Sequence, residues 1–196
     1  TVKSSNHVGG FTTEATDGNL DAFEDLWNRC REIGLNDPSN ANYFALQGLD
    51  TDGVRDPELP VLLDVEALID YMLVIFWTGD GDAVLSNFLG SNRANNWFGI
   101  RNRNSDEGFR FFAHDAEHTL GNSTSREDRT GPFTGSNQNN FLYANPQWMH
   151  QDLMANAEYR LLFADRAQTH FFRTGALTEP VAIERFNART DQVRPA

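Results

Sequence analysis

The sequence predicts an α+β fold that is mostly helical, with one small β-hairpin near its middle. In several long segments apolar residues recur at spacings of three and four, which is the period of an amphipathic helix. Strand-like alternation of side chains is concentrated in residues 96–113. A chain of 196 residues suits one domain with a substantial core. Residues 1–196 are therefore expected to form a single unit.

Two helices are predicted in the first half of the chain. The first covers residues 17–34, which place apolar side chains on one face. The second covers residues 62–79, with Asp64 as its N-cap and Gly79 as its stop. Because the second half of this helix is apolar almost all round, we expect it at the centre of the domain.

The predicted hairpin consists of strands at residues 96–103 and 108–113, joined by a turn at residues 104–107. The aromatic content of the second strand predicts burial on both of its faces. Asp115 follows that strand directly. Since burial of an ionised carboxylate is costly unless it is paired or binds a metal, Asp115 is expected to have a partner. The alternative is that Asp115 simply caps a turn, where aspartate is common.

The C-terminal part is predicted to be helical after a long polar loop at residues 122–140. Residues 145–175 carry two helical patterns, with Pro146 in a first turn and a break near Asn156. Residues 178–194 predict a final helix. The aromatic side chains expected in the core of this region are Trp148, Phe163, Phe171 and Phe172.

Composition excludes several classes of protein. The net charge is −12 and Lys3 is the single lysine, so no basic stripe is available for a nucleic-acid backbone. Cys30 is the single cysteine, which excludes an internal disulfide and a multi-cysteine zinc site; we expect it buried on a helix. No apolar run is long enough to span a membrane.

Polar side chains gather at the ends of three apolar elements. They are Asp80 and Asp82 after the central helix, Asn95 and Asn96 before the first strand, and Asp115 and Glu117 after the second. Phosphoryl transfer uses one aspartate to orient the acceptor hydroxyl, and an asparagine with a second aspartate to hold magnesium. Such oxygen ligands fit Mg²⁺, Mn²⁺ or Ca²⁺ better than zinc.

His114 and His118 flank Asp115 at a spacing of four. On a helix this spacing would suit a zinc pair, but here the two residues follow a strand and lack a third ligand of the right type. We expect both histidines to make structural hydrogen bonds.

Four runs resemble the CotH family, the atypical kinases named after a spore-coat protein: residues 62–83, 95–98, 108–121 and 145–166. The resemblance covers roughly residues 60–175. It implies a kinase-like fold, of which this chain matches the C-terminal lobe. It also implies transfer of phosphate from ATP to Ser/Thr hydroxyls of a protein substrate with Mg²⁺ or Mn²⁺, and favours the exterior or cell envelope of a bacterium.

The resemblance also implies roles for individual residues. Asp82 matches the catalytic-loop aspartate, and Asn95 or Asn96 matches the metal-binding amide. Asp115 matches the aspartate of the protein-kinase Asp-Phe-Gly motif, and Glu117 a second acidic position. ATP would then be bound through Asn95, Asn96 and Asp115, and the metal through Asp115, Asn96 and Glu117.

The sequence departs from the family pattern at three places. Asp80 stands where asparagine is usual, and His114 where tryptophan is common. Residues 83–94 are longer than the matching segment of the spore-coat members. This last departure affects the side of the site where the acceptor would bind.

Kinase chemistry also needs a phosphate-covering loop and a lysine with a glutamate partner. Residues 1–16 are too few to supply that lobe, and Lys3 is too isolated in the sequence. We therefore expect the chain to be a C-terminal lobe whose N-terminal lobe or partner segment is missing. Such a lobe would bind nucleotide very weakly and expose apolar surface.

Two other functions remain open. Asp80, Asp82, Asp115 and Glu117 would also suit a non-catalytic module that binds calcium and stabilises a surface or adhesion protein. Two of these carboxylates would also suit the acid and base of a glycoside hydrolase. The asparagine pair between the acidic residues favours metal and phosphate chemistry over sugar hydrolysis.

Overall fold

A computed structural model of the chain describes residues 1–5, 11–121 and 128–194. Its strands are β1 (Val2–Ser5), β2 (Thr12–Ala15), β3 (Val84–Leu85), β4 (Ala94–Asn95), β5 (Trp97–Ile100) and β6 (Arg110–Ala113). Its α-helices are α1 (Asp21–Leu35), α2 (Asn40–Ala45), α3 (Val65–Thr78), α4 (Pro146–Leu153), α5 (Ala157–Phe171) and α6 (Glu179–Val193). Short 3₁₀ helices are η1 (Asn87–Leu89) and η2 (Phe141–Tyr143). The predicted α+β class, mostly helical, is confirmed.

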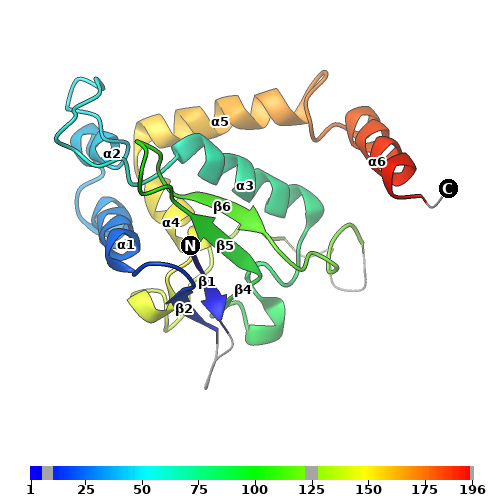
Figure 1. Ribbon diagram of the computed structural model, residues 1–196, viewed down its shortest axis with the longest axis horizontal. Helices are drawn as coiled ribbons and strands as arrows, with labels where there is room; N and C mark the ends of the chain where they lie inside the picture. Colours follow the sequence, from blue (N-terminus) through cyan, green and yellow to red (C-terminus); the bar gives the residue numbers. More distant parts are fainter. Residues whose placement is uncertain (6–10, 122–127, 195–196) are drawn as a thin grey trace.

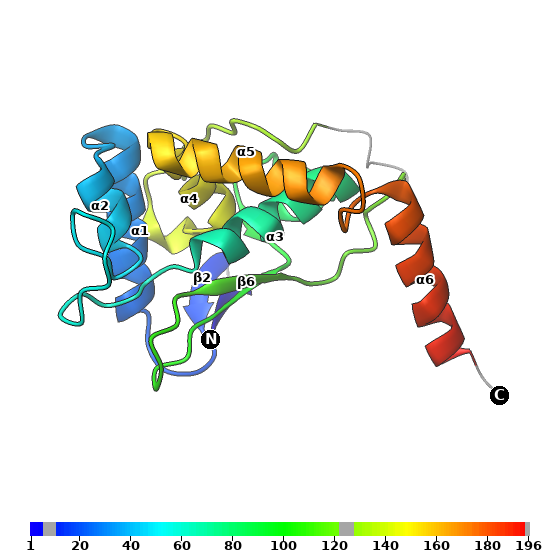
Figure 2. The ribbon, with the colours of Figure 1, turned by 90° about the horizontal axis from the view of Figure 1, so that it is seen from above.

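The central helix α3 begins and ends where the sequence predicts. The Asp64 side chain accepts the backbone N–H of Ala67 at 3.0 Å, which caps the N-terminus. Gly79 ends the helix in the left-handed conformation, with φ at 63°, a conformation that favours glycine. The helix packs against β6, α4 and α5, and it crosses the middle of the molecule in Figures 1 and 2. Its central position is thus confirmed.

The predicted hairpin is formed by β5 and β6, which pair antiparallel from Trp97↔Ala113 to Ile100↔Arg110. It belongs to a larger antiparallel sheet with the order β2-β1-β5-β6. The sequence did not reveal β1 and β2. They are short and mixed in composition, and β1 is held by its pairing with β5, in which Val2 lies opposite Gly99. A side chain at position 99 would come within 2.8 Å of Val2, so the glycine allows this close contact.

The prediction that the second strand is buried on both faces is wrong. Phe109 and Phe111 are each 5% exposed, whereas Phe112 is 47% exposed and Asp115 lies at the surface. The physical reason is that the helices cover only one face of the sheet (Figure 2). Asp115 therefore does not carry the cost of burial that first singled it out.

The C-terminal helices follow the prediction at their boundaries. Asn156 accepts the backbone N–H of Tyr159 at 3.0 Å and caps α5, so the predicted break is confirmed. Trp148 is fully buried, as expected. Phe172 is 62% exposed, against expectation, because it follows the last turn of α5 in an extended conformation and leaves the helix face that Phe171 occupies.

The predicted polar loop is described in part, since residues 122–127 lie outside the described residues. Between residues 128 and 140 the chain forms turns and coil, in agreement with the prediction. Cys30 is buried on α1, as expected. None of the described helices is long and apolar enough to cross a membrane.

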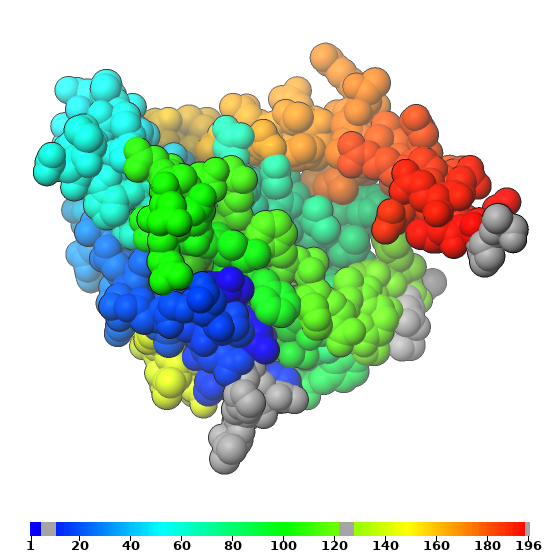
Figure 3. Space-filling model, in the orientation of Figure 1, coloured from blue at the N-terminus to red at the C-terminus, as the bar shows by residue number. Residues whose placement is uncertain are grey.

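Helix α6 lies at the edge of the molecule, and none of its residues is buried. A groove separates it from the end of α3, visible as a hollow in Figure 3. Its lining is largely apolar: Trp77, Leu120, Ala176, Leu177, Ala182, Ile183 and Phe186, with Glu179 and Arg185. The described chain therefore exposes apolar surface here.

The buried imidazole of His150 gives a test of the helical core. His150 is 4% exposed, contacts the Tyr159 hydroxyl through Nδ1 at 2.7 Å, and packs against Phe76 and Phe163. Burial lowers its pKa to about 4, whereas the unfolded chain protonates this residue near pH ~6.5. The stability that its neutral form contributes is therefore full above pH ~6.5 and is lost as the pH falls toward 4.

We expect the free energy of unfolding to fall by about 2 to 3 kcal/mol between pH 7 and pH 4.5 because of His150 alone. The measurement is urea unfolding of wild type and His150→Gln at both pH values. The difference between the two proteins isolates the imidazole, because other groups titrate equally in both. An equal pH dependence in the two proteins would contradict the prediction.

Candidate functional site

The three polar clusters meet at one end of the hairpin. The segment after β6 returns to the C-terminal end of α3, where the N–H of Gly81 donates to the His118 carbonyl at 3.1 Å. The N–H of Leu120 donates to the Thr78 carbonyl at 2.8 Å. The start of β5 lies opposite the end of β6, where Trp97 pairs with Ala113. The residues that follow α3, precede β5 and follow β6 therefore come together.

Asp82 is at the centre of this arrangement. Its Oδ2 accepts hydrogen bonds from the side-chain amides of Asn95 and Asn96, both at 3.0 Å, and its Oδ1 accepts one from the Ser86 hydroxyl. The Asn96 amide also lies 3.4 Å from the backbone oxygen of Asp115. The structure thus brings Asp82, both asparagines and Asp115 together. Their metal-binding and catalytic roles stay predictions.

Two residues of the site have left-handed backbones. Asn96 has φ at 53° and Asp115 at 52°. Asparagine and aspartate visit this conformation more readily than other non-glycine residues. Left-handed non-glycine residues cluster at functional sites, where the surrounding structure holds them in place. Asn96 and Asp115 contact each other, so their left-handed backbones independently indicate a functional site here.

The donor atoms present fit a hard divalent cation. Both amides turn their nitrogens toward Asp82, so the amide oxygens are the ends that remain for a cation. Asp115 and Glu117 lie at the surface. Among the described residues, no three His, Cys, Asp or Glu gather as a metal cluster. Carboxylate and amide oxygens are the ligands that Mg²⁺ and Mn²⁺ prefer in proteins.

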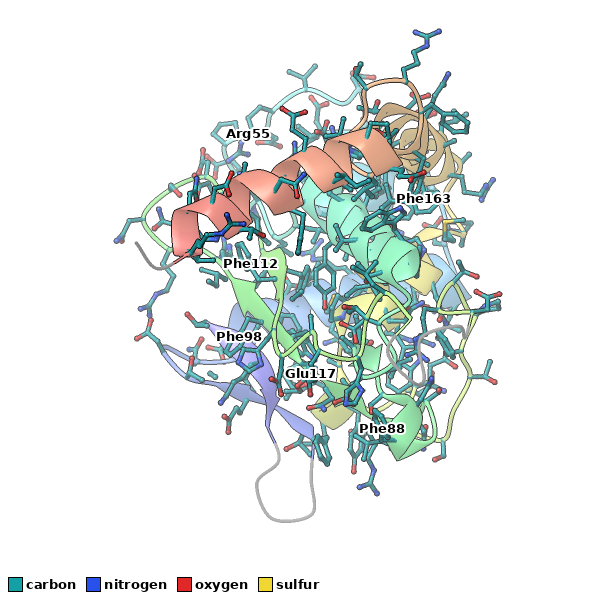
Figure 4. The ribbon with its side chains drawn as sticks, turned by 90° about the vertical axis from the view of Figure 1, so that its right-hand side faces the viewer. Arg55, Phe88, Phe98, Phe112, Glu117 and Phe163 are labelled. Carbon is teal, nitrogen blue, oxygen red and sulfur yellow. The ribbon has the colours of Figure 1, made fainter. Side chains whose placement is uncertain are left out.

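Glu117 and the two histidines have partners of their own. Glu117 Oε1 lies 3.5 Å from Nε2 of His118, and Figure 4 shows Glu117 between Phe98 and Phe88. The His118 ring packs on Phe88 with ring centres 4.8 Å apart. The His114 ring meets Phe98 at 5.1 Å. The two histidines therefore make separate aromatic contacts. The structural interpretation predicts hydrogen bonding instead, and the buried Nδ1 of His118 has no hydrogen-bond partner among the described residues.

The structure also separates the roles open to Asp80 and Asp82. Asp80 is 1% exposed and Asp82 is partly exposed. Burial raises the pKa of Asp80, and backbone N–H groups of the loop oppose that shift. Asp82 is thus the carboxylate of this pair that a substrate or ion can reach.

Sequence reasoning missed two residues that shape the loop after α3. Ser86 is buried and binds Asp82. Arg129 is 3% exposed, and its guanidinium donates to the Leu85 carbonyl and to the Asn87 side chain. An arginine in a long polar loop carries no local signal for such a role. The contact spans more than 40 residues of sequence.

An aromatic row lies beside the site on the uncovered face of the sheet. Phe98 and Phe112 are cross-strand partners on β5 and β6, and both are labelled in Figure 4. Lys3 lies opposite Phe98 on β1, with its Nζ 6.0 Å from the ring centre. Lys3 Nζ also lies 3.3 Å from Glu14 Oε1. Lys3, isolated in the sequence, is thus paired with a glutamate next to the site.

Phosphoryl-transfer enzymes use an aspartate to orient the acceptor and an asparagine with a second aspartate to hold the metal, and side chains of these types meet here in an α+β fold. The chain belongs to the CotH kinase family: the family model described as CotH kinase protein matches residues 23–196. This membership indicates a kinase-like phosphotransferase that acts on a protein substrate, using ATP and a divalent metal in general. Searches of curated proteins and of solved structures found no match.

Proposed function

We propose that this protein is the catalytic lobe of an ATP-dependent kinase that phosphorylates Ser/Thr hydroxyls of a protein substrate with Mg²⁺ or Mn²⁺. The observation that carries the proposal is the contact of Asp82 with the amides of Asn95 and Asn96. It occurs in a member of the CotH kinase family. The two amides and the Ser86 hydroxyl together hold this partly exposed carboxylate in one orientation.

Each residue then has a distinct task. Asp82 orients the acceptor hydroxyl and receives its proton, while Asn95 holds the carboxylate in place. Asn96 and Asp115, with Glu117 nearby, supply oxygens for the cation. When bound, the cation neutralises charge on the phosphate groups. A second lobe or partner segment supplies the phosphate-covering loop in this proposal.

The function test is titration with ATP in the presence and absence of Mn²⁺, followed by transfer of the labelled γ-phosphate to protein. It is carried out on residues 1–196 alone and with upstream sequence added. A kinase binds ATP and metal together. A cation-binding adhesion module would bind calcium without regard to ATP, and a glycoside hydrolase would cleave sugars in its absence.

The uncovered aromatic face suits the nucleotide base. Stacking of one base on an aromatic side chain is worth about 1–3 kcal/mol. In the full-length protein we therefore expect Phe98→Ala to raise the KM for ATP about 10-fold and to change kcat less than about 2-fold. Steady-state kinetics with varied ATP check this. Phe172→Ala, which removes an exposed phenylalanine far along the chain, is the matched control and should leave KM unchanged.

A further inference from the structure

Asp80 lies directly behind the candidate site, where α3 passes into the loop that carries Asp82. Gly79 reverses the chain with its left-handed backbone. The N–H groups of Gly79 and Asp80 then both donate to the carbonyl of Ile75, at 3.1 and 3.3 Å. The Asp80 side chain turns inward, and the residue is 1% exposed. The end of the central helix therefore fixes the position from which this carboxyl group acts.

One oxygen of Asp80 holds the loop. Oδ1 accepts the backbone N–H of Asp82 at 3.0 Å, and the backbone N–H of Ala83 also bonds to this carboxyl group. A carboxylate that accepts N–H groups two and three residues later stabilises a tight turn. With its backbone held from the inside, Asp82 directs its own carboxylate to Asn95 and Asn96.

The other oxygen of Asp80 distinguishes the turn at residues 80–83 from an ordinary surface turn. Oδ2 is buried and has no hydrogen-bond partner among the described residues, and the same holds for the hydroxyl of Tyr71. Burial raises the pKa of Tyr71, and the charge of Asp80 raises it further, so the two groups lie within electrostatic range. An incompletely satisfied buried carboxylate is unfavourable. The hydrogen bond that Asp80 does make, from the backbone N–H of Asp82 to Oδ1, is the one that orients Asp82.

We propose that Asp80 is a positioning residue for the phosphoryl-transfer site. Its carboxyl group holds the turn so that Asp82 Oδ2 stays within hydrogen-bond distance of the amide nitrogens of Asn95 and Asn96. The expected effect on kcat, the kinetic part, rests on the proposed function. The expected effect on the contacts of Asp82 with Asn95 and Asn96, the geometric part, does not. A purely structural role at the end of α3 would alter stability without altering the Asp82 contacts.

The geometric part is tested by NMR of the side-chain NH₂ groups of Asn95 and Asn96 in the full-length protein. Asp80→Ala should shift both pairs of signals and speed their hydrogen exchange about 10-fold. Asp80→Asn keeps an acceptor oxygen and should leave them near their wild-type positions. The matched control is Asp50→Ala, because Asp50 also accepts an N–H two residues later, at 2.9 Å, in a turn outside the site.

The kinetic part separates positioning from stability. Because misplacement of a catalytic group by about 1 Å costs up to ~10²-fold, Asp80→Ala should lower kcat by about 10- to 100-fold. The KM for ATP should stay within about 2-fold, and Asp80→Asn should keep at least about half of kcat.

The outcomes separate the two hypotheses. A folded Asp80→Ala with unchanged NH₂ signals overturns the proposal. If Asp80→Ala does not fold, the test uses Asp80→Asn instead. Loss of the wild-type NH₂ signals in folded Asp80→Asn overturns the role of the acceptor oxygen. A wild-type protein without phosphoryl transfer refutes the proposed function, whereas the NMR comparison still tests the positioning.

Discussion

Asp115→Asn in the full-length protein is expected to lower the rate of phosphoryl transfer by about 10²- to 10³-fold or more, because it removes one negative charge from the proposed cation site. The fold should remain intact. Position 115 has a left-handed backbone, with φ at 52°, and asparagine adopts this conformation as readily as aspartate. The side chain also lies at the surface, so its replacement leaves no cavity.

The measurement is transfer of labelled phosphate at saturating ATP, together with binding of Mn²⁺ and thermal unfolding. Glu184→Gln, which neutralises an exposed carboxylate on α6, is the control for the change in net charge and should keep full activity. Undiminished transfer by Asp115→Asn would remove Asp115 from the metal site and move that role to another residue.

Arg31→Met is expected to cause the largest loss of stability, about 3–5 kcal/mol. Arg31 on α1 donates to both carboxylate oxygens of Asp152 on α4, at 2.8 and 2.9 Å. The two side chains are only 11% and 7% exposed. Removal of the guanidinium leaves a buried carboxylate without its counter-charge. Urea unfolding at pH 8 measures the loss.

The loss should depend on pH in a defined direction. Burial raises the pKa of Asp152 to about 7, with Arg31 opposing the shift. A folded-state pKa above the unfolded value of ~3.9 means that the folded state binds the proton more tightly, so stability falls as the pH rises between these values. Without Arg31 the folded-state pKa of Asp152 rises further, so the fall in stability continues to higher pH. The cost of Arg31→Met should therefore be smaller at pH 5 than at pH 8.

Arg29 provides the matched control for this experiment. It forms an ion pair with Asp25 on the same helix at 2.8 Å, but both side chains are more than 40% exposed. Arg29→Met should cost less than about 0.5 kcal/mol. The double variant Arg31→Met/Asp152→Leu should recover much of the loss, since it removes the unpaired charge as well. Equal losses of stability in Arg31→Met and Arg29→Met would show that burial of the Arg31–Asp152 pair does not set the cost of breaking it.

Much of the candidate site was open to prediction because its residues lie at the ends of recognisable elements. Asp82 follows a helix that ends at Gly79, and Asp115 follows a strand rich in phenylalanine. The meeting of Asp82 and Asp115 at Asn96 follows from the antiparallel pairing of β5 with β6. The argument that Asp115 is a buried carboxylate was wrong, although the position it indicated is next to the cluster.

Other parts of the site carry no local signal. Arg129 reaches Leu85 across a long polar loop, and Lys3 meets Glu14 and Phe98 only because β1 joins the sheet. Such contacts depend on the path of the chain between distant segments. Neither hydrophobic periodicity nor a helix-capping pattern in the sequence predicts such long-range contacts.

The sequence by itself determined the class of fold, the end signals of α3, α5 and α6, the β5–β6 hairpin and the family. The predicted start of the first helix at residue 17 was wrong, because α1 begins at Asp21 without a side-chain cap. Helix periodicity and end signals such as Asp64, Gly79 and Asn156 are local, so they can be read from neighbouring residues. Only the tertiary structure decided that Asp80 is buried and Asp82 accessible, since exposure depends on which face of the loop packs on the core. It also decided that one sheet face stays uncovered, because that depends on where helices distant in sequence come to rest.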